Sequence, residues 1–106
     1  MSTDVEIVLV TATFQAASGR EAALAAVLAK YVVLSRNQPG CRNIDLAASS
    51  LTAGRFVVVE KWENAAAQRA HFDSPEMVEM ARACNGLLSE PPNIDLLEGI
   101  SAHDLA

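Results

Sequence analysis

The chain has 106 residues, a formal net charge of −5 at pH 7, and a composition of 51% hydrophobic and 20% charged residues. These values exclude an intrinsically disordered chain and predict one domain over residues 1–106, with a core at about 5–100 and a tail at 101–106. The acidic balance argues against nucleic-acid and anionic-membrane partners, and no apolar run is long enough to span a bilayer.

The chain contains two cysteines, Cys41 and Cys84, and their separation matches no metal-binding spacing. A domain with a core of this size needs no disulfide, and the N-terminus lacks the basic segment of a secretory signal. A reduced, cytoplasmic protein without a bound metal is therefore expected, with both thiols as small core residues. A thiol-based mechanism is not expected, because neither cysteine has a base nearby in the sequence.

The first third of the chain predicts a strand followed by a helix. Residues 5–14 are rich in β-branched side chains and contain no Gly or Pro, which is typical of a strand with two apolar faces. Ser18 followed by Glu21 matches a capping box, so a helix is expected to begin there. The turn-forming residues 37–40 end this helix. Its apolar stripe consists of Ala23, Leu24, Val27, Leu28, Tyr31 and Leu34.

Two further strands are predicted at residues 41–48 and 56–62, joined by a hairpin turn at 49–55. Because side chains alternate along a strand, Asn43 lies on the opposite side of the second strand from Ile44. The same alternation gives the third strand one face with Phe56, Val58, Glu60 and Trp62, and another with Val57, Val59 and Lys61.

Two short helices and a last strand complete the predicted elements. Asn64 is placed to cap a helix that runs through Phe72. Ser74, followed directly by a proline, predicts the start of another helix, for which Gly86 is the expected C-cap. Residues 94–100 predict the last strand.

The predicted order β-α-β-β-α-α-β is that of a ferredoxin-like, split βαβ α+β fold with the second helix broken in two. Four antiparallel strands with helices on one face leave the other face of the sheet bare. That face is expected to carry Val57 and Val59, together with Val8 and Val10 from the first strand. An exposed apolar face of this size favours a homodimer in which two sheets pack together.

Three groups of residues resemble the pattern of a known family. They are the turn Pro39-Gly40-Cys41, a strand that holds Phe56 and ends in Glu60-Lys61-Trp62, and the segment Ala70-His71-Phe72-Asp73-Ser74-Pro75. In this order, and over residues 8–97, the sequence resembles the antibiotic biosynthesis monooxygenase (ABM) family. The resemblance implies a dimeric α+β barrel. Members of that family include cofactor-free oxygenases acting on phenols and quinols, haem-degrading proteins and a signal-molecule isomerase.

The sequence departs from two groups of these relatives. Haem-degrading members use an Asn on the first strand and a His on the last helix, whereas this first strand has no Asn and residues 77–86 contain no His. Haem binding is therefore not expected. Quinone-forming members tend to carry an Asn four residues before the tryptophan, where this chain has Val58. Phenol oxidation here would therefore depend on Trp62, His71 and Arg82.

Trp62, Glu60 and His71 are the predicted catalytic residues. The resemblance implies that Trp62 stacks on a flat substrate and offers its indole N–H to an oxyanion, while core packing is the structural alternative. A lone carboxylate is costly to bury on this strand face, so Glu60 is expected to pair with His71. The pair would either order the broken helix or make His71 a base that takes a phenolic proton.

Five residues are predicted to bind substrate: Arg82, Tyr31, Asn43, Phe56 and Val58. Arg82 would bind an oxyanion or carboxylate if its side chain points inward, and is otherwise a solvated surface arginine. Tyr31 and Asn43 are weaker candidates of the same kind. Phe56 and Val58 share the strand face of Glu60.

These residues together predict a cofactor-independent monooxygenase that acts on a small aromatic phenol or quinol with molecular oxygen. No flavin, haem or metal is expected, because the deprotonated substrate itself supplies the electrons. The expected partners are then the substrate, oxygen and a second copy of the chain. Two alternatives stay open on the same fold: a non-catalytic small-molecule-binding dimer, and an isomerase of a small metabolite that consumes no oxygen.

Overall fold

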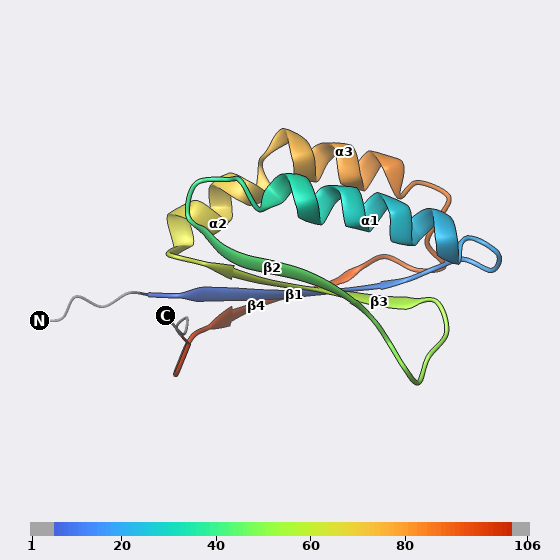
Figure 1. Ribbon diagram of the computed structural model, residues 1–106, viewed down its shortest axis with the longest axis horizontal. Coiled ribbons are helices and arrows are strands. Elements are labelled where there is room, and N and C mark those ends of the chain that lie inside the picture. Colours follow the sequence, from blue (N-terminus) through green and yellow to red (C-terminus); the bar gives the residue numbers. More distant parts are fainter. Residues whose placement is uncertain (1–5, 103–106) are drawn as a thin grey trace, which may run out of the picture.

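A computed structural model describes residues 6–102 of the chain. Within this range, a four-stranded antiparallel sheet of order β2-β3-β1-β4 has its helices on one face (Figure 1). The strands are β1 (Val8–Gln15), β2 (Cys41–Ala48), β3 (Arg55–Trp62) and β4 (Asn93–Glu98), and the helices are α1 (Glu21–Ser35), α2 (Ala65–Phe72) and α3 (Pro75–Ala83). The predicted element order and the ferredoxin-like α+β fold are confirmed.

The two outer elements of the chain differ slightly from their predicted bounds. The first strand begins at Val8, and the predicted start at residue 5 lies outside the described residues. The last strand ends at Glu98 rather than Ile100, because Glu98 is the residue that pairs with the first residue of β1. Of the predicted tail, residues 103–106 lie outside the described range.

The register of β1 corrects one prediction about the faces of the sheet. Val8 and Val10 pair with Trp62 and Glu60, so they lie on the helix-covered face and not on the bare one. Val10 is only 4% exposed there. The prediction was wrong because a strand that is apolar on both faces shows no alternation from which its register can be read.

The bare face of the sheet combines apolar and polar side chains. Leu9 of β1, Val57 and Val59 of β3, and Leu97 of β4 lie on it, as the pairing of the three strands shows. Their neighbours on the same face are the polar residues Thr11, Thr13, Asp45, Lys61 and Asp95. The predicted positions of Val57 and Val59 are therefore confirmed.

Side-chain caps separate the second and third helices. The Asn64 Oδ1 atom accepts a hydrogen bond from the Ala67 amide at 2.8 Å, and Ser74 Oγ accepts one from the Met77 amide at 3.2 Å. Both caps were predicted from the sequence, and each satisfies an amide that the first turn of a helix leaves free. The break between α2 and α3 leaves His71 in the last turn of α2, buried against the sheet.

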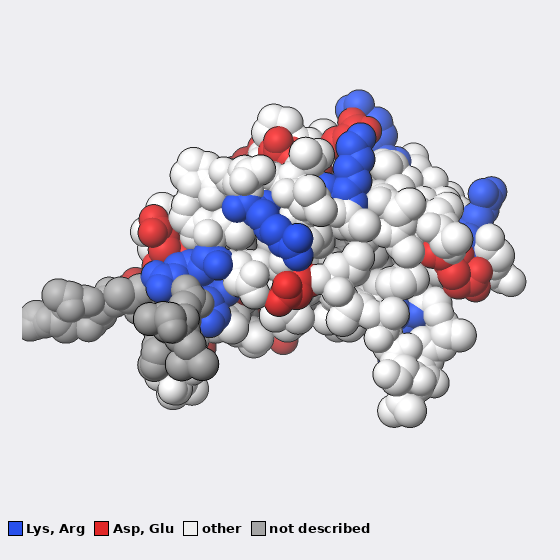
Figure 2. Space-filling model, viewed as in Figure 1, with Lys and Arg blue, Asp and Glu red and all other residues white. Residues whose placement is uncertain are grey.

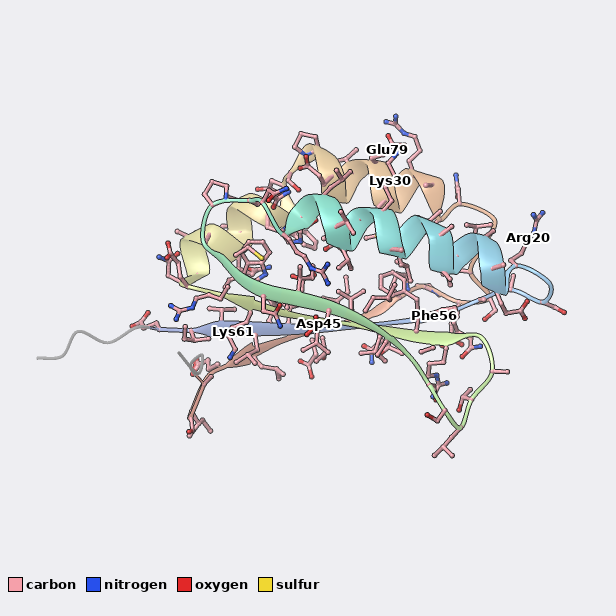
Figure 3. The ribbon with its side chains drawn as sticks, in the orientation of Figure 1. Arg20, Lys30, Asp45, Phe56, Lys61 and Glu79 are labelled. Carbon is pink, nitrogen blue, oxygen red and sulfur yellow. The ribbon has the colours of Figure 1, made fainter. Side chains whose placement is uncertain are left out.

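The start of α1 differs from the predicted capping box. Ser18 does not cap the helix, which begins at Glu21 after Arg20 and has no side-chain cap. Figure 3 shows the Arg20 side chain pointing outward at this end of the helix. Gly19 adopts a positive φ of 80° in the turn that leaves β1, and this turn moves the helix start beyond the reach of Ser18.

The helices cover the sheet incompletely on their own side. Ile94 and Leu96 of β4 pair with Ala12 and Val10, so they face the helix side, yet they remain 44% and 60% exposed.

Among the described residues on the face that Figure 2 shows, basic and acidic side chains alternate without an extended basic patch. No helix within residues 6–102 has the length and apolar character needed to cross a membrane.

Candidate functional site

A cavity of about 760 Å³ lies between the helices α2 and α3 and the strands β1 and β4. Its walls are mainly apolar and include Phe14, Phe72, Met77, Met80, Leu88 and Leu96. The polar side chains that reach it are Tyr31, Glu60, Gln68, Arg69 and His71. A cavity of this size and character can hold one small, largely apolar molecule.

Tyr31, Glu60 and His71 form a buried hydrogen-bonded cluster at the cavity wall. The Tyr31 hydroxyl donates to Glu60 Oε2 at 2.9 Å and lies 2.7 Å from His71 Nε2. Each of the three residues is no more than 3% exposed. Glu60 Oε1 is 3.6 Å from His71 Nε2, so the predicted pair does meet, and the tyrosine hydroxyl contacts both partners.

Trp62 contacts Glu60 and His71 of this cluster but does not line the cavity. Its side chain is 0% exposed, and its indole N–H donates to Glu60 Oε1 at 2.9 Å. Its ring stacks on the imidazole of His71, with centroids 4.4 Å apart and an interplanar angle of 28°. The predicted contact with substrate is therefore not what the structure shows, because both the ring face and the N–H are used within the protein.

Gln38 connects the cluster to the third helix. Its Oε1 atom lies 2.7 Å from His71 Nδ1, and its Nε2 donates to Glu76 Oε1 at 2.7 Å. Sequence reasoning missed both Gln38 and Glu76 as members of the site. The available signal was that Gln38 directly precedes the Pro39-Gly40 turn of the family-like motif.

The cluster changes the pKa values of two of its members. Burial alone raises the pKa of the Glu60 carboxyl, but the hydrogen bond and charge of His71 and the hydrogen bonds from Trp62 and Tyr31 outweigh it, so this pKa lies below its usual value. Burial, reinforced by the neighbouring Glu60 carboxylate, raises the pKa of the Tyr31 phenol well above its usual range. Glu60 is therefore an anion at neutral pH, and Tyr31 keeps its proton.

Four predicted substrate-binding residues lie away from the cavity. Val58 is 0% exposed in the core, and Phe56 packs against that core from a partly buried position. Asn43 lies on the bare face of the sheet, where it donates to Asp45 Oδ2 at 2.8 Å. Arg82 is exposed on α3 and does not line the cavity. Of the five predicted substrate-binding residues, the structure brings Tyr31 alone to the cavity wall.

Arg69, and not the predicted Arg82, is the arginine at the cavity wall. It is the cationic side chain, among the described Lys and Arg residues, that lines the cavity. Both arginines are exposed, and of the two it is Arg69 that also lines the cavity. Arg69 comes from α2, the same helix that supplies His71.

The two cysteines are free thiols. Cys84 is buried in the core and lies at the cavity wall, and Cys41 packs against the core from β2. Burial raises the pKa of both thiols, so neither is an activated nucleophile. The described residues hold no group of three or more His, Cys, Asp or Glu side chains arranged to bind a metal ion.

The chain is therefore an α+β domain with a ferredoxin-like sheet, and its apolar cavity has a buried Tyr-Glu-His cluster at the wall. The antibiotic biosynthesis monooxygenase family model matches residues 7–83, and the chain belongs to this family. No curated protein matches the chain significantly.

Solved structures share this fold over nearly the whole chain. A protein from Pseudomonas aeruginosa is 28% identical, with 95% of this chain and 100% of that chain covered and a TM-score of 0.82. A protein from Mycobacterium tuberculosis is 26% identical, with 92% and 99% covered and a TM-score of 0.86. A protein from Nitrosomonas europaea, provisionally named an antibiotic biosynthesis monooxygenase, is 15% identical, with 95% and 97% covered and a TM-score of 0.85. At that identity the last likeness shows the fold alone.

Proposed function

We propose that this protein is a cofactor-independent monooxygenase that oxidises a small aromatic phenol or quinol with molecular oxygen. The observation that carries the proposal is the buried Tyr31-Glu60-His71 cluster at the wall of an otherwise apolar cavity. A flat apolar molecule with one acidic hydroxyl matches such a site, because its rings are desolvated and its hydroxyl meets the polar cluster. Family membership supports the proposal, since the family is described as monooxygenases.

The first step is removal of a proton from the substrate by the cluster. The substrate hydroxyl donates to the oxygen of Tyr31. The Tyr31 hydroxyl hydrogen turns from Glu60 Oε2 toward His71 Nε2, 2.7 Å away, and passes to that nitrogen. Glu60 remains an anion next to the imidazole and stabilises the positive charge that forms on it. Tyr31 thus has the role of a proton relay, and His71 that of the final base.

The second step is oxidation of the resulting anion. The electron-rich anion transfers one electron to oxygen, and the substrate radical and superoxide combine to a peroxide anion. This anion takes back the proton held by His71 and becomes a hydroperoxide. Loss of water then leaves a carbonyl group. In sum, one aromatic C–H, the phenolic O–H and one O₂ become two C=O groups and one H₂O, and the substrate supplies all of the electrons. The apolar walls favour this chemistry because they keep bulk water from the reactive anion.

Arg69 and Trp62 have supporting roles in this proposal. Arg69 is placed to bind an anionic substituent of the substrate, the role that the sequence suggested for Arg82. Trp62 holds the Glu60 carboxylate and the His71 ring in place rather than binding the substrate. A reduced, cytoplasmic protein with no flavin, haem or metal is part of the same proposal.

The proposal is tested by oxygen uptake with a panel of reduced naphthols, anthrones and catechols, in the presence of a metal chelator. Uptake above the autoxidation rate is expected. His71→Ala and Tyr31→Phe are each expected to lower kcat by about 100-fold or more, the lower bound for loss of an acid–base group. Arg69→Gln is expected to raise KM for substrates that carry a carboxylate, while the matched variant Arg82→Gln leaves KM unchanged.

Other outcomes point to other functions. A compound that binds the folded protein tightly and is recovered unchanged would make the chain a small-molecule-binding module. A compound that is rearranged without oxygen uptake, and only when His71 is present, would make it an isomerase, since the cluster can also return a proton to a different atom of the same substrate. Normal turnover by His71→Ala would contradict the assignment of His71 as the base.

A further inference from the structure

Two residues outside the cavity form a hydrogen-bonded chain that ends at the imidazole of His71. Gln38 lies half-buried in the turn between α1 and β2, and Glu76 lies in the first turn of α3. Neither residue lines the cavity, so neither is placed to touch a substrate bound there. Gln38 contacts His71 Nδ1 at 2.7 Å and Glu76 at 2.7 Å, and thus bridges the two.

The bridge fixes which end of the Gln38 amide faces the histidine. A carboxylate only accepts hydrogen bonds, so Glu76 requires the NH₂ end of the Gln38 amide. The carbonyl oxygen of Gln38 is then the atom that faces His71 Nδ1. Because a carbonyl oxygen also only accepts, Nδ1 must carry a hydrogen. In the neutral imidazole, Nε2 is consequently the atom with the free lone pair, and it faces Tyr31.

The hydrogen count of the cluster supports a role in proton uptake. The contacts Glu60–Tyr31 and Tyr31–His71, at 2.9 and 2.7 Å, each need one hydrogen, and Tyr31 supplies one. Trp62 and Tyr31 both donate to the ionised Glu60, so the second hydrogen is present only after His71 Nε2 has been protonated. The distances therefore fit the cluster best after His71 has taken up a proton. A site that fits this protonated arrangement favours transfer of a proton to His71.

We infer that Gln38, itself oriented by Glu76, is a positioning residue that holds His71 in the tautomer with Nδ1–H and a free Nε2. The use of that free nitrogen for a substrate proton rests on the proposed function, whereas the tautomer itself does not. If Gln38 is replaced by leucine, nothing accepts from Nδ1. The hydrogen then moves to Nε2 and donates to Tyr31, and Tyr31 donates to Glu60. This arrangement fills both contacts and leaves His71 no lone pair toward Tyr31.

The tautomer is measured by ¹⁵N NMR of the imidazole, at a pH where the ring is neutral. The chain has two histidines, so His103→Gln leaves His71 as the one observed ring. The His103→Gln protein, which keeps the native Gln38, is expected to show a His71 ring with a hydrogen on Nδ1 and none on Nε2. Gln38→Leu is expected to show the reverse, and Glu76→Leu a mixture, because the amide is then free to turn over.

A charge-conserving exchange provides the matched control. In the double variant Gln38→Glu/Glu76→Gln, a carboxylate accepts from Nδ1 and an amide NH₂ donates to that carboxylate. The Nδ1–H tautomer of the wild type is expected to return. Three outcomes would each overturn the inference. The wild type could show the Nε2–H tautomer, Gln38→Leu could keep the wild-type tautomer, or the folded double variant could show the Nε2–H tautomer. If Gln38→Leu does not fold, Glu76→Leu and the double variant decide the question.

Catalytic activity is a second, separate measurement, made with the substrate that the oxygen-uptake experiment identifies. Gln38→Leu is expected to lower kcat by about 100-fold with little change in KM, because the base is removed while the cavity is intact. The double variant is expected to recover most of the lost kcat. A reversed tautomer with normal kcat would overturn the positioning role. A failure of the proposed function would appear instead as no uptake by any variant, with the NMR pattern as predicted.

Discussion

Glu60 shows how single contacts determine the state of a buried residue. Three side chains, Tyr31, Trp62 and His71, surround its carboxylate, which is 3% exposed. An isolated carboxylate in such a place would be neutral. The donors around it reverse this outcome and lower its pKa. The sequence predicted that Glu60 needs a partner, but it did not predict that Tyr31 stands between the carboxylate and the imidazole.

Glu60 is expected to make folding stability depend on pH in the acid range. Its pKa in the folded protein lies below the ordinary value of 4.5, so the unfolded chain takes up the proton first as the pH falls. Its contribution is fully present above about pH 4.5 and is lost as the pH falls through the folded value. Chemical unfolding between pH 3 and pH 7 measures this loss. Glu60→Gln should lose less stability over that range than the wild type, and an equal loss would contradict the assignment.

At the scale of elements, the turn before β2 is fitted against the second helix. Gly40 has a positive φ of 81°, and its carbonyl accepts from the Glu63 amide at 2.9 Å. A Cβ at this position would collide with the Cβ of Ala67 in α2. This close approach brings Gln38, two residues earlier, to the histidine of the same helix. The glycine therefore connects a local turn to the geometry of the site.

Replacing Gly40 by alanine is expected to destabilise the protein more than replacing Gly19. Both glycines have positive φ, but a Cβ at Gly19 would meet nothing within 4 Å. Gly19→Ala should cost about 1 kcal/mol from backbone strain. Gly40→Ala should cost at least about 2 kcal/mol, because overpacking against Ala67 adds to that strain. Urea unfolding measures both values, and equal values would show that the turn and α2 separate easily.

At the scale of the whole molecule, no helix of residues 6–102 covers one of the two faces of the sheet. Leu9, Val57, Val59 and Leu97 lie on this face, and Val59 is 41% exposed. Burying such an area is favourable, and pairing two identical sheets is a symmetric way to do so. We propose that the protein forms a homodimer through this face, as the sequence suggested.

The dimer is expected to dissociate when a charge is placed in the middle of the bare face. Val59→Lys introduces an ammonium group that the dimer would have to desolvate, at a cost that attraction to Asp45, opposite it on the same face, offsets only in part. The matched control is Val33→Lys, since Val33 is 57% exposed on α1, away from this face. Sedimentation velocity should show a dimer for the wild type and for Val33→Lys, and a monomer for Val59→Lys. A monomeric wild type would refute the proposed interface.

The sequence alone determined the order of the elements, the second strand to the residue, and the caps at Asn64 and Ser74. These features follow from local signals, namely alternation, turn residues and cap residues within a few positions of each other. The cost of burying a lone carboxylate also predicted His71 as the partner of Glu60, and the two side chains do meet. Local signals misled at Ser18, where a glycine turn displaced the helix start.

Only the tertiary structure decided which residues complete the site. Tyr31 is 29 positions from Glu60 and 40 from His71, and Gln38 is 33 positions from His71. No periodicity reports contacts over such separations, because they depend on how α1, β3 and α2 pack. The same packing places Arg69, and not Arg82, at the cavity wall, and it pairs the indole N–H of Trp62 with Glu60. Chemistry that depends on distances between elements is set by their packing, whereas the elements themselves are set by neighbouring residues.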